Sequence, residues 1–227
     1  MKLLAVETAT EACSAALYID GVISERFELA ARHHTKLILP MIDELMSEAG
    51  LKPKDLDALA FGRGPGSFTG IRIATGVIQG IAFGADLPVV PVSTLAALAQ
   101  DFFDRHSENV AFTAMDARMD EIFWGVYQRD AEGFANLLGK EVVTPAALCV
   151  VPDLTGAGCG SGWGVYNDIL KNKLAGRLSF IESEILPRAS AIARLGVRGF
   201  NQGLAVGVEQ AMPVYLRDNV AKKESER

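Results

Sequence analysis

The chain has 227 residues, of which 49% are hydrophobic and 22% are charged, a balance typical of a folded globular protein and not of a disordered chain. Its 28 acidic and 22 basic residues give a net charge of −6, which disfavours autonomous binding to nucleic acid. The three cysteines, Cys13, Cys149 and Cys159, have no C-x-x-C spacing, so the sequence argues against a disulfide scaffold and a zinc ribbon.

The apolar segments are too short to enter a membrane as helices. The run after the N-terminus ends at Glu7, which leaves too few apolar residues for the core of a signal peptide. The uncharged run from Ile73 to Ala85 contains three glycines and falls short of the ~20 residues that a bilayer span needs. We therefore expect a cytoplasmic protein that makes no membrane contact.

In chain order, the first half predicts strands that alternate with helices. Asp20-Gly21 is a strong signal for a two-residue hairpin between the second and third strands. Helical periodicity follows and stops at Gly50, a residue suited to the end of a helix. We expect strands at 2–7, 13–19, 22–29, 58–61 and 88–92, and helices at 35–49, after 62–70, and at 95–103.

The second half repeats the start of this pattern. Strands are expected at 111–116 and 122–129, and a shift of 109 positions places Glu7 on Asp116 and Tyr18 on Tyr127. A helix is expected at 189–199. Before it, a loop is predicted by Gly156, Gly158, Gly160, Gly162 and Gly164. Strands that alternate with helices predict an α/β fold, and the shift leaves open whether two similar lobes arose by duplication.

The glycine-rich segment 62–70 links a short buried strand to a helix. Free backbone N–H groups at such a helix start can bind an anion. The segment lacks the Lys-Ser/Thr ending of a P-loop, and Pro65 and Thr69 stand where a nucleophile elbow around Ser67 would need glycines. The sequence favours the alternative, a structural tight turn that lets the strand and the helix pack closely.

Glu7, Gly66 and Asp116 are the candidate cofactor-binding residues. Glu7 and Asp116 end expected central strands, where open α/β sheets present ligand groups, so they could hold a hydrated magnesium ion or orient a phosphate. Equally, each carboxylate could cap the turn that follows it by accepting backbone N–H groups. The three histidines have no metal-binding spacing, so no metal site is predicted.

Two helices are apolar over more than one face. In the helix at 35–49, apolar residues cover an arc of roughly 200°, about twice what one core contact requires. In the helix after 62–70, only Arg72, Thr75 and Gln79 form a polar seam, and three interior glycines each cost about 1 kcal/mol relative to alanine. Close approach by another helix would offset that cost, either within a fully buried pair or at a subunit interface. We favour the interface, with candidate partner-binding residues Leu37, Met41, Leu45, Thr69, Arg72, Ile73, Gly76, Val77 and Gly80.

Five segments together resemble the TsaB (YeaZ) family, and the resemblance extends along essentially the whole chain. They are residues 7–10 (ETAT), 64–72 (GPGSFTGIR), 92–95 (VSTL), 116–121 (DARMDE) and 213–217 (PVYLR). The resemblance implies an actin/Hsp70/sugar-kinase-like fold with two related lobes. It places an N-terminal lobe with the partner-binding helices at 1–105 and a C-terminal lobe at 106–227, whose last helix can pack back on the first lobe.

The resemblance also implies a role without catalysis. Proteins of this family are non-catalytic partners of TsaD, the enzyme that transfers a threonylcarbamoyl group to the adenosine beside the anticodon in tRNAs that read codons starting with A. A small ATPase, TsaE, joins them, and tRNA would be contacted only indirectly. The family meets TsaD through the two helices of the first lobe, and forms homodimers through the same surface.

One position pair separates this chain from TsaD-type enzymes. Their two metal-binding histidines, four residues apart, correspond here to Thr94 and Leu98, so the resemblance implies an inactive paralogue without a metal. No cofactor is expected, and weak binding of a nucleotide is left open. The alternative is an ATP-dependent phosphotransferase of the same fold that uses Glu7, Asp116 and the glycine-rich segments and binds Mg-ATP alone. A metallopeptidase would require a bound metal.

Overall fold

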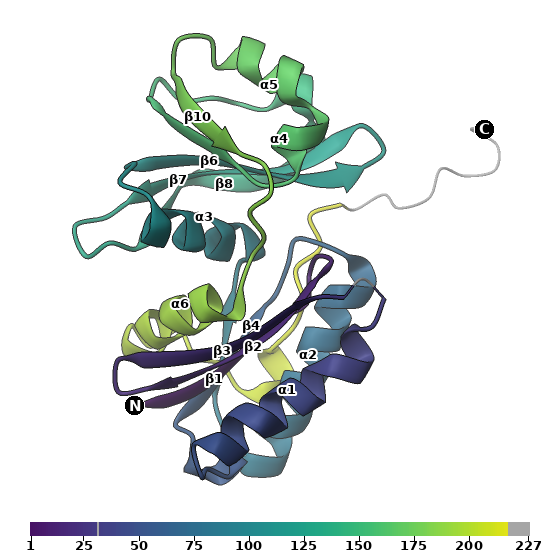
Figure 1. Ribbon diagram of the computed structural model, residues 1–227, viewed down its shortest axis with the longest axis vertical. Helices are drawn as coiled ribbons and strands as arrows, with labels where there is room; N and C mark the ends of the chain where they lie inside the picture. The colour runs from purple at the N-terminus through teal and green to yellow at the C-terminus, as the bar shows by residue number, and fades with distance from the viewer. Residues whose placement is uncertain (31, 218–227) are drawn as a thin grey trace, which may run out of the picture.

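The computed structural model describes residues 1–30 and 32–217, and these form two lobes, each built on a five-stranded mixed sheet (Figure 1). The first sheet has the order β3-β2-β1-β4-β5, and the second, β10-β9-β6-β7-β8, repeats that order when read from its other end. The strands of the first sheet are β1 (Lys2–Glu7), β2 (Ala12–Ile19), β3 (Val22–Leu29), β4 (Ala58–Gly62) and β5 (Val89–Val92). Those of the second sheet are β6 (Val110–Arg118), β7 (Glu121–Arg129), β8 (Ala135–Pro145), β9 (Gly156–Cys159) and β10 (Leu178–Glu182).

The two sheets also share their strand directions. In each, the first three strands along the chain are antiparallel neighbours, and the last two join in parallel. The common order and direction confirm the predicted α/β fold with two related lobes, the arrangement of the actin/Hsp70/sugar-kinase class.

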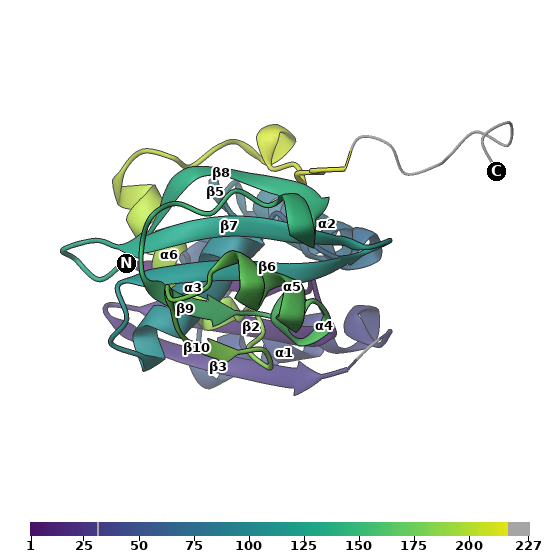
Figure 2. The same cartoon turned by 90° about the horizontal axis from the view of Figure 1, so that it is seen from above.

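Helices cover both faces of both sheets, so the molecule is layered (Figures 1 and 2). The outer face of the first sheet carries α1 (His34–Glu48) and α2 (Phe68–Ala85), and its inner face carries α6 (Ala189–Asn201). The inner face of the second sheet carries α3 (Thr94–Arg105), which packs against α6, and its outer face carries α4 (Gly162–Val165) and α5 (Asn167–Lys173). The short 3-10 turns are η1 (Pro53–Asp55), η2 (Ala146–Leu148) and η3 (Val208–Gln210).

The central strands are apolar on both faces because each face is covered. Along β1, Leu4 and Val6 pack towards α1 and α2, whereas Leu3 and Ala5 pack towards α6. Four apolar clusters therefore lie one on each side of the two sheets.

The helix before the expected boundary after residue 105, α3, packs with both lobes. Leu95, Leu98 and Phe102 pack into the core of the second lobe, and Ala97 packs into the core on the inner face of the first sheet. The chain then returns, since Ile192 of α6 packs with the first sheet. Residues 218–227 of the expected C-terminal lobe lie outside the described residues.

Four of the five alternating glycines lie in regular structure, which corrects the predicted loop, and Gly160 lies in the bend between them. Gly156 and Gly158 lie in β9, and Gly162 and Gly164 lie in α4. A Cβ on Gly158 would come within 2.4 Å of the Trp163 ring, so glycine lets the buried tryptophan lie directly on the strand. The strands β8 and β10 and the helix α5 were also not predicted.

The shift of 109 positions holds for β1 and β6 but not for the strands that follow. Glu7 faces Ser14 across the first hairpin, and the shift would place Phe123 opposite Asp116. Instead Asp116 faces Ile122, because the connection between β6 and β7 is one residue shorter. Tyr18 and Tyr127 are therefore not equivalent in register.

Among the described residues, α2 is the helix whose length and composition would suffice to cross a membrane. Its buried residues Ile71, Ala74, Ile78 and Ala82 face the first sheet, and all but Ile71 belong to the core cluster on its outer face. The apolar character of α2 therefore serves the packing of the first lobe on one side.

Candidate partner-binding face and interlobe cleft

The outer side of α2 carries glycines that nothing in the described chain approaches. The helix begins at Ser67, whose Oγ accepts a hydrogen bond from the N–H of Gly70, and ends at Asp86 in a left-handed conformation. A Cβ built on Gly76, Gly80 or Gly84 would meet no atom within 4 Å. The buried-pair explanation for these glycines is therefore wrong within the described residues.

The other α2 residues predicted to bind a partner share this outer side. Thr69 and Arg72 are exposed, and Ile73 and Val77 are half-buried on the flank towards α1. Together with the open glycines they form a continuous surface, which we call the outer face of α2: Thr69, Arg72, Ile73, Gly76, Val77, Gly80 and Gly84.

The apolar arc of α1 has a different explanation from the one the sequence suggested. Met41 is 7% exposed and Leu45 is 1% exposed, and both lie in the core between α1 and the sheet. Leu37 is half-buried against the same core. Met41 and Leu45 are thus removed from the surface that a partner can reach, whereas Leu39, which was not predicted, is 54% exposed.

A second flank of α2 is formed by the segment that follows α6. Arg72 donates from Nε to the hydroxyl of Tyr215 at 2.9 Å, and its guanidinium lies 3.7 Å from the centroid of the Phe68 ring. Gln79 donates from Nε2 to the carbonyl of Ala211 at 2.9 Å. Two of the three residues of the polar seam therefore bind a distant segment, a role that the sequence did not reveal, whereas Thr75 donates to the Ile71 carbonyl of its own helix.

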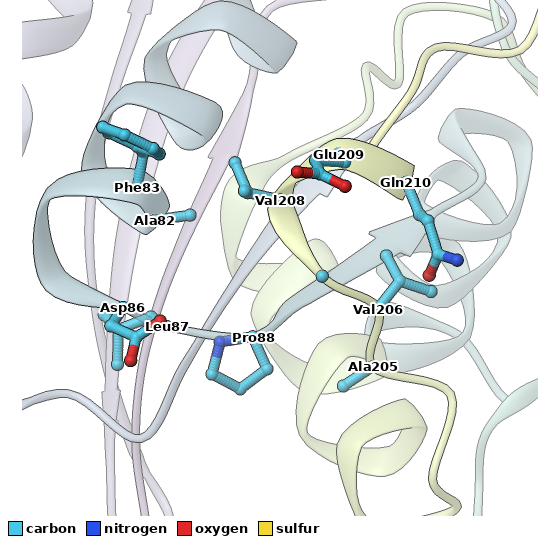
Figure 3. Close-up of a pocket in the computed structure, with 11 residues that line it drawn as sticks. Ala82, Phe83, Asp86, Leu87, Pro88, Ala205, Val206, Val208, Glu209 and Gln210 are labelled. Carbon is cyan, nitrogen blue, oxygen red and sulfur yellow. The ribbon is translucent and has the colours of Figure 1, made fainter.

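A pocket of about 740 Å³ lies where this segment passes the C-terminal end of α2 (Figure 3). Ala82 and Phe83 line it from the helix, and residues 205–210 line it from the opposite side. Phe83 is 82% exposed, so one side of the pocket is an aromatic ring that is open to solvent.

A second cavity, of about 730 Å³, opens between the lobes and brings together two of the three candidate cofactor-binding residues. Gly66 lines it from the first lobe, and Asp116 lines it from the second. Asp116 Oδ1 accepts the N–H of Arg118 at 2.9 Å, and Oδ2 pairs with the Arg118 guanidinium at 2.9 Å. The capping role considered for Asp116 is therefore realised, at the edge of this cleft.

Glu7, the third candidate, does not reach the cleft. Its side chain is fully buried: Oε1 accepts the N–H of Ala9 at 2.6 Å, and Oε2 accepts from Thr94 Oγ1 at 3.3 Å. Burial raises the pKa of the Glu7 carboxyl to about 7, and the two hydrogen bonds only partly oppose this rise. Glu7 caps the turn after β1, and its place among cofactor-binding residues is not supported.

The glycine-rich segment 62–70 serves close packing. A Cβ on Gly62 would lie 1.9 Å from Glu7 Oε2, one on Gly66 would lie 2.6 Å from the Ala9 carbonyl, and one on Gly70 would lie 2.0 Å from the Thr8 carbonyl. The N–H of Ser67 already donates to the Ala9 carbonyl at 2.7 Å. These contacts agree with the tight turn that the sequence favoured over an anion site.

The described residues contain no group of three or more His, Cys, Asp or Glu side chains able to hold a metal ion. Thr94 and Leu98, the positions at which the resemblance places the TsaD-type histidines, make contacts inside the chain. Thr94 donates to Glu7, and Leu98 is buried in the core around α3.

Comparison with known proteins gives one consistent result. A family model described as TsaD, tRNA N6-adenosine threonylcarbamoyltransferase, matches residues 20–225. The tRNA threonylcarbamoyladenosine biosynthesis protein TsaB of Escherichia coli (strain K12) is 41% identical over 228 residues, which cover 99% of this chain and 98% of that protein. The corresponding protein of Haemophilus influenzae is 40% identical over 99% of this chain and 97% of its own length.

The solved structures agree with the sequence relatives. YeaZ from Pseudomonas aeruginosa is similar to this chain with a TM-score of 0.88 and 42% identity, over 95% of this chain and 99% of its own. A second structure from Pseudomonas aeruginosa, described as an uncharacterized protein with similarity to peptidase YeaZ, has a TM-score of 0.89 over the same shares. The chain therefore belongs to the TsaB (YeaZ) family of tRNA threonylcarbamoyladenosine biosynthesis proteins.

Proposed function

We propose that this protein is a non-catalytic subunit of the machinery that threonylcarbamoylates the adenosine beside the anticodon, and that it binds a TsaD-type transferase through the outer face of α2. The single observation that carries this proposal is the open space around Gly76, Gly80 and Gly84. Glycines inside a helix cost about 1 kcal/mol each relative to alanine, and nothing in the described chain offsets that cost. A helix of another subunit that lies close against the backbone would do so.

The chemistry of the two lobes supports the non-catalytic part of the proposal. A phosphotransferase that uses Glu7 would need that carboxylate at the interlobe cleft, but both of its oxygens are engaged inside the first lobe. Thr94 and Leu98 offer no metal ligand set in place of the two histidines. Weak nucleotide binding at the cleft stays a proposal that rests on Gly66 and Asp116.

Family membership supports the remaining partners in this proposal. A TsaE-type ATPase joins the complex, and tRNA is contacted mainly by the other subunits, which suits a chain of net charge −6. Without its partner the chain forms a homodimer through the outer face of α2. The protein works in the cytoplasm, where tRNA is modified, and no membrane takes part.

The test is the affinity of the full chain for its cognate TsaD-type subunit, measured by calorimetry. The change Gly80→Leu fills the open space, and we expect it to weaken binding at least about tenfold, which is about 1.4 kcal/mol. Gly164→Leu is the matched control, because Gly164 is an exposed glycine in a helix of the other lobe.

The same pair of variants tests the function in the cell. Gly80→Leu should lower threonylcarbamoyladenosine in total tRNA, measured by mass spectrometry, and Gly164→Leu should not. Unchanged affinity and unchanged modification with Gly80→Leu would refute the proposed function.

A further inference from the structure

Residues 205–217 form a strap that runs from the first lobe to the second along the flank of α2. The strap starts at β5, where Val206 and Val89 exchange both backbone hydrogen bonds, at 2.9 and 2.8 Å. It then passes α2, where Ala211 is fully buried and accepts the hydrogen bond from Gln79. The first half of the strap is thus part of the packed outer layer of the first lobe.

The second half of the strap is held by the start of α2 and by the turn before it. The N–H of Val214 donates to the carbonyl of Arg63 at 2.8 Å. The Tyr215 ring lies 5.6 Å from the Phe68 ring, and its hydroxyl accepts from Arg72. Two members of the polar seam, Arg72 and Gln79, therefore fix the strap at two points along one helix.

The strap ends in a clasp on the second lobe. Arg217 pairs with Glu121 Oε2 through Nε at 3.1 Å and Nη2 at 2.5 Å, and Nη2 also donates to the carbonyls of Ala117 and Arg118. These residues surround the turn between β6 and β7, in which Arg118, Met119 and Asp120 all have left-handed backbone conformations. Arg217 thus binds carbonyls at a turn whose left-handed backbone conformation is unfavourable for most residue types.

The strap also extends the outer surface of the first lobe. α2 contacts α1 on one side and η3 of the strap on the other, and all three cover the same face of the sheet. Met212 is 57% exposed and lies beside Gln79, and Tyr215 is exposed beside Phe68. A partner helix seated on Gly76 and Gly80 would find these side chains next to it, on the flank opposite α1.

We propose that the strap is the second wall of the partner-binding face, with Met212 and Tyr215 in contact with an apolar helix of the TsaD-type subunit, and that Arg217 positions this wall through its clasp on Glu121. The proposal rests on the proposed function, because it assigns the occupant of the outer face of α2. The continuity of the strap with that face supports a single occupant across both. Partner affinity then depends on a contact in the second lobe that the partner does not touch.

The contact is tested with Met212→Asp in the full chain, by calorimetry with the TsaD-type subunit. Its control is Leu148→Asp, since Leu148 is similarly exposed at 69% but lies in η2 of the second lobe. We expect Met212→Asp to weaken binding at least about tenfold with the melting temperature unchanged, and Leu148→Asp to leave binding unchanged. If Met212→Asp binds like the wild type while Gly80→Leu does not, the strap proposal fails and the proposed function stands.

The clasp is tested by charge reversal. Arg217→Glu and Glu121→Arg should each weaken partner binding, and the double variant, which restores the ion pair but not the hydrogen bonds to the carbonyls of Ala117 and Arg118, should recover part of the affinity. Recovery in the double variant identifies the pair as a positioning contact. Single variants that bind normally, or a double variant no better than the singles, would overturn the role of the clasp. If Gly80→Leu itself leaves binding unchanged, the proposed function fails first.

Discussion

Glu7 is a carboxylic acid in an environment that excludes water. It is an acid at the end of a central strand, surrounded by the first lobe and bonded to Ala9 and Thr94. Burial destabilises the charged carboxylate more than its hydrogen bonds stabilise it, so the pKa of Glu7 rises to about 7. A side chain at position 62 would collide with this carboxylate, because a Cβ on Gly62 would lie 1.9 Å from Glu7 Oε2.

The raised pKa of Glu7 gives a stability that depends on pH. The unfolded carboxyl loses its proton near its usual pKa of 4.5, whereas the folded one retains it until about pH 7. Over that window the folded state binds more protons, so the contribution of Glu7 to the free energy of unfolding falls as the pH rises, by about 3 kcal/mol in total. Glu7→Gln should remove this loss, because a neutral amide can accept from Ala9 and donate to Thr94.

Urea unfolding between pH 5 and pH 8 measures this effect. The difference in stability between Glu7→Gln and the wild type should move in favour of the variant as the pH rises. A difference that is constant across the window would contradict a neutral Glu7.

Within α2 and the turn before it, glycines of two kinds follow one another. Gly66 and Gly70 lie where a Cβ would collide with the backbone of the connection between β1 and β2. Gly76 and Gly80 lie where a Cβ would meet nothing. The first kind is required by the fold of the monomer. The second kind destabilises the helix, and no close contact within the described chain compensates for that cost.

Alanine substitution should separate the two kinds. Gly80→Ala should stabilise the isolated chain by about 0.5–1 kcal/mol, because it improves helix propensity in open space. Gly70→Ala should destabilise it, since the added Cβ would lie 2.0 Å from the Thr8 carbonyl. Thermal unfolding at concentrations where the chain is monomeric gives the sign of each change, and a destabilised Gly80→Ala would mean that this glycine has a structural role in the monomer.

The sequence predicts the elements of the first lobe well because their signals are local. Asp20-Gly21 sets the hairpin between β2 and β3, Gly50 ends α1, and both appear where expected. It fails where tertiary packing decides: β9 is a strand of glycine, alanine and cysteine that has no strand pattern of its own and exists because Trp163 covers it.

The same limit applies to the candidate site. The spacing of Gly76 and Gly80 marks the outer face of α2, but periodicity alone cannot say which apolar residues of α1 point inwards, so Met41 and Leu45 were placed on the surface although they are core. The contacts of Tyr215 and Arg217 join segments that lie 143 and 96 residues apart in the chain, and no local pattern encodes them.

At the scale of the whole molecule, the two lobes repeat one sheet but differ in what covers it. Between β3 and β4 the chain forms α1, whereas between the corresponding strands β8 and β9 it forms only the short turn η2. The counterpart of α2, between β9 and β10, consists of the short helices α4 and α5. Long helices with an open side are therefore a property of the first lobe, and this explains why the proposed partner-binding face occurs once.

The proposed single face has a consequence for assembly: the proposal requires self-association and partner binding to exclude each other. Adding the TsaD-type subunit to the homodimer should yield a one-to-one complex while the homodimer disappears, and the apparent affinity for the partner should fall as the concentration of this chain rises through its self-association constant. Native mass spectrometry of a titration follows all three species, with Gly164→Leu as the control that preserves both equilibria. Gly80→Leu should weaken both together. A stable complex that holds two copies of this chain in contact through α2 and a bound partner as well would show that the two interactions use different surfaces.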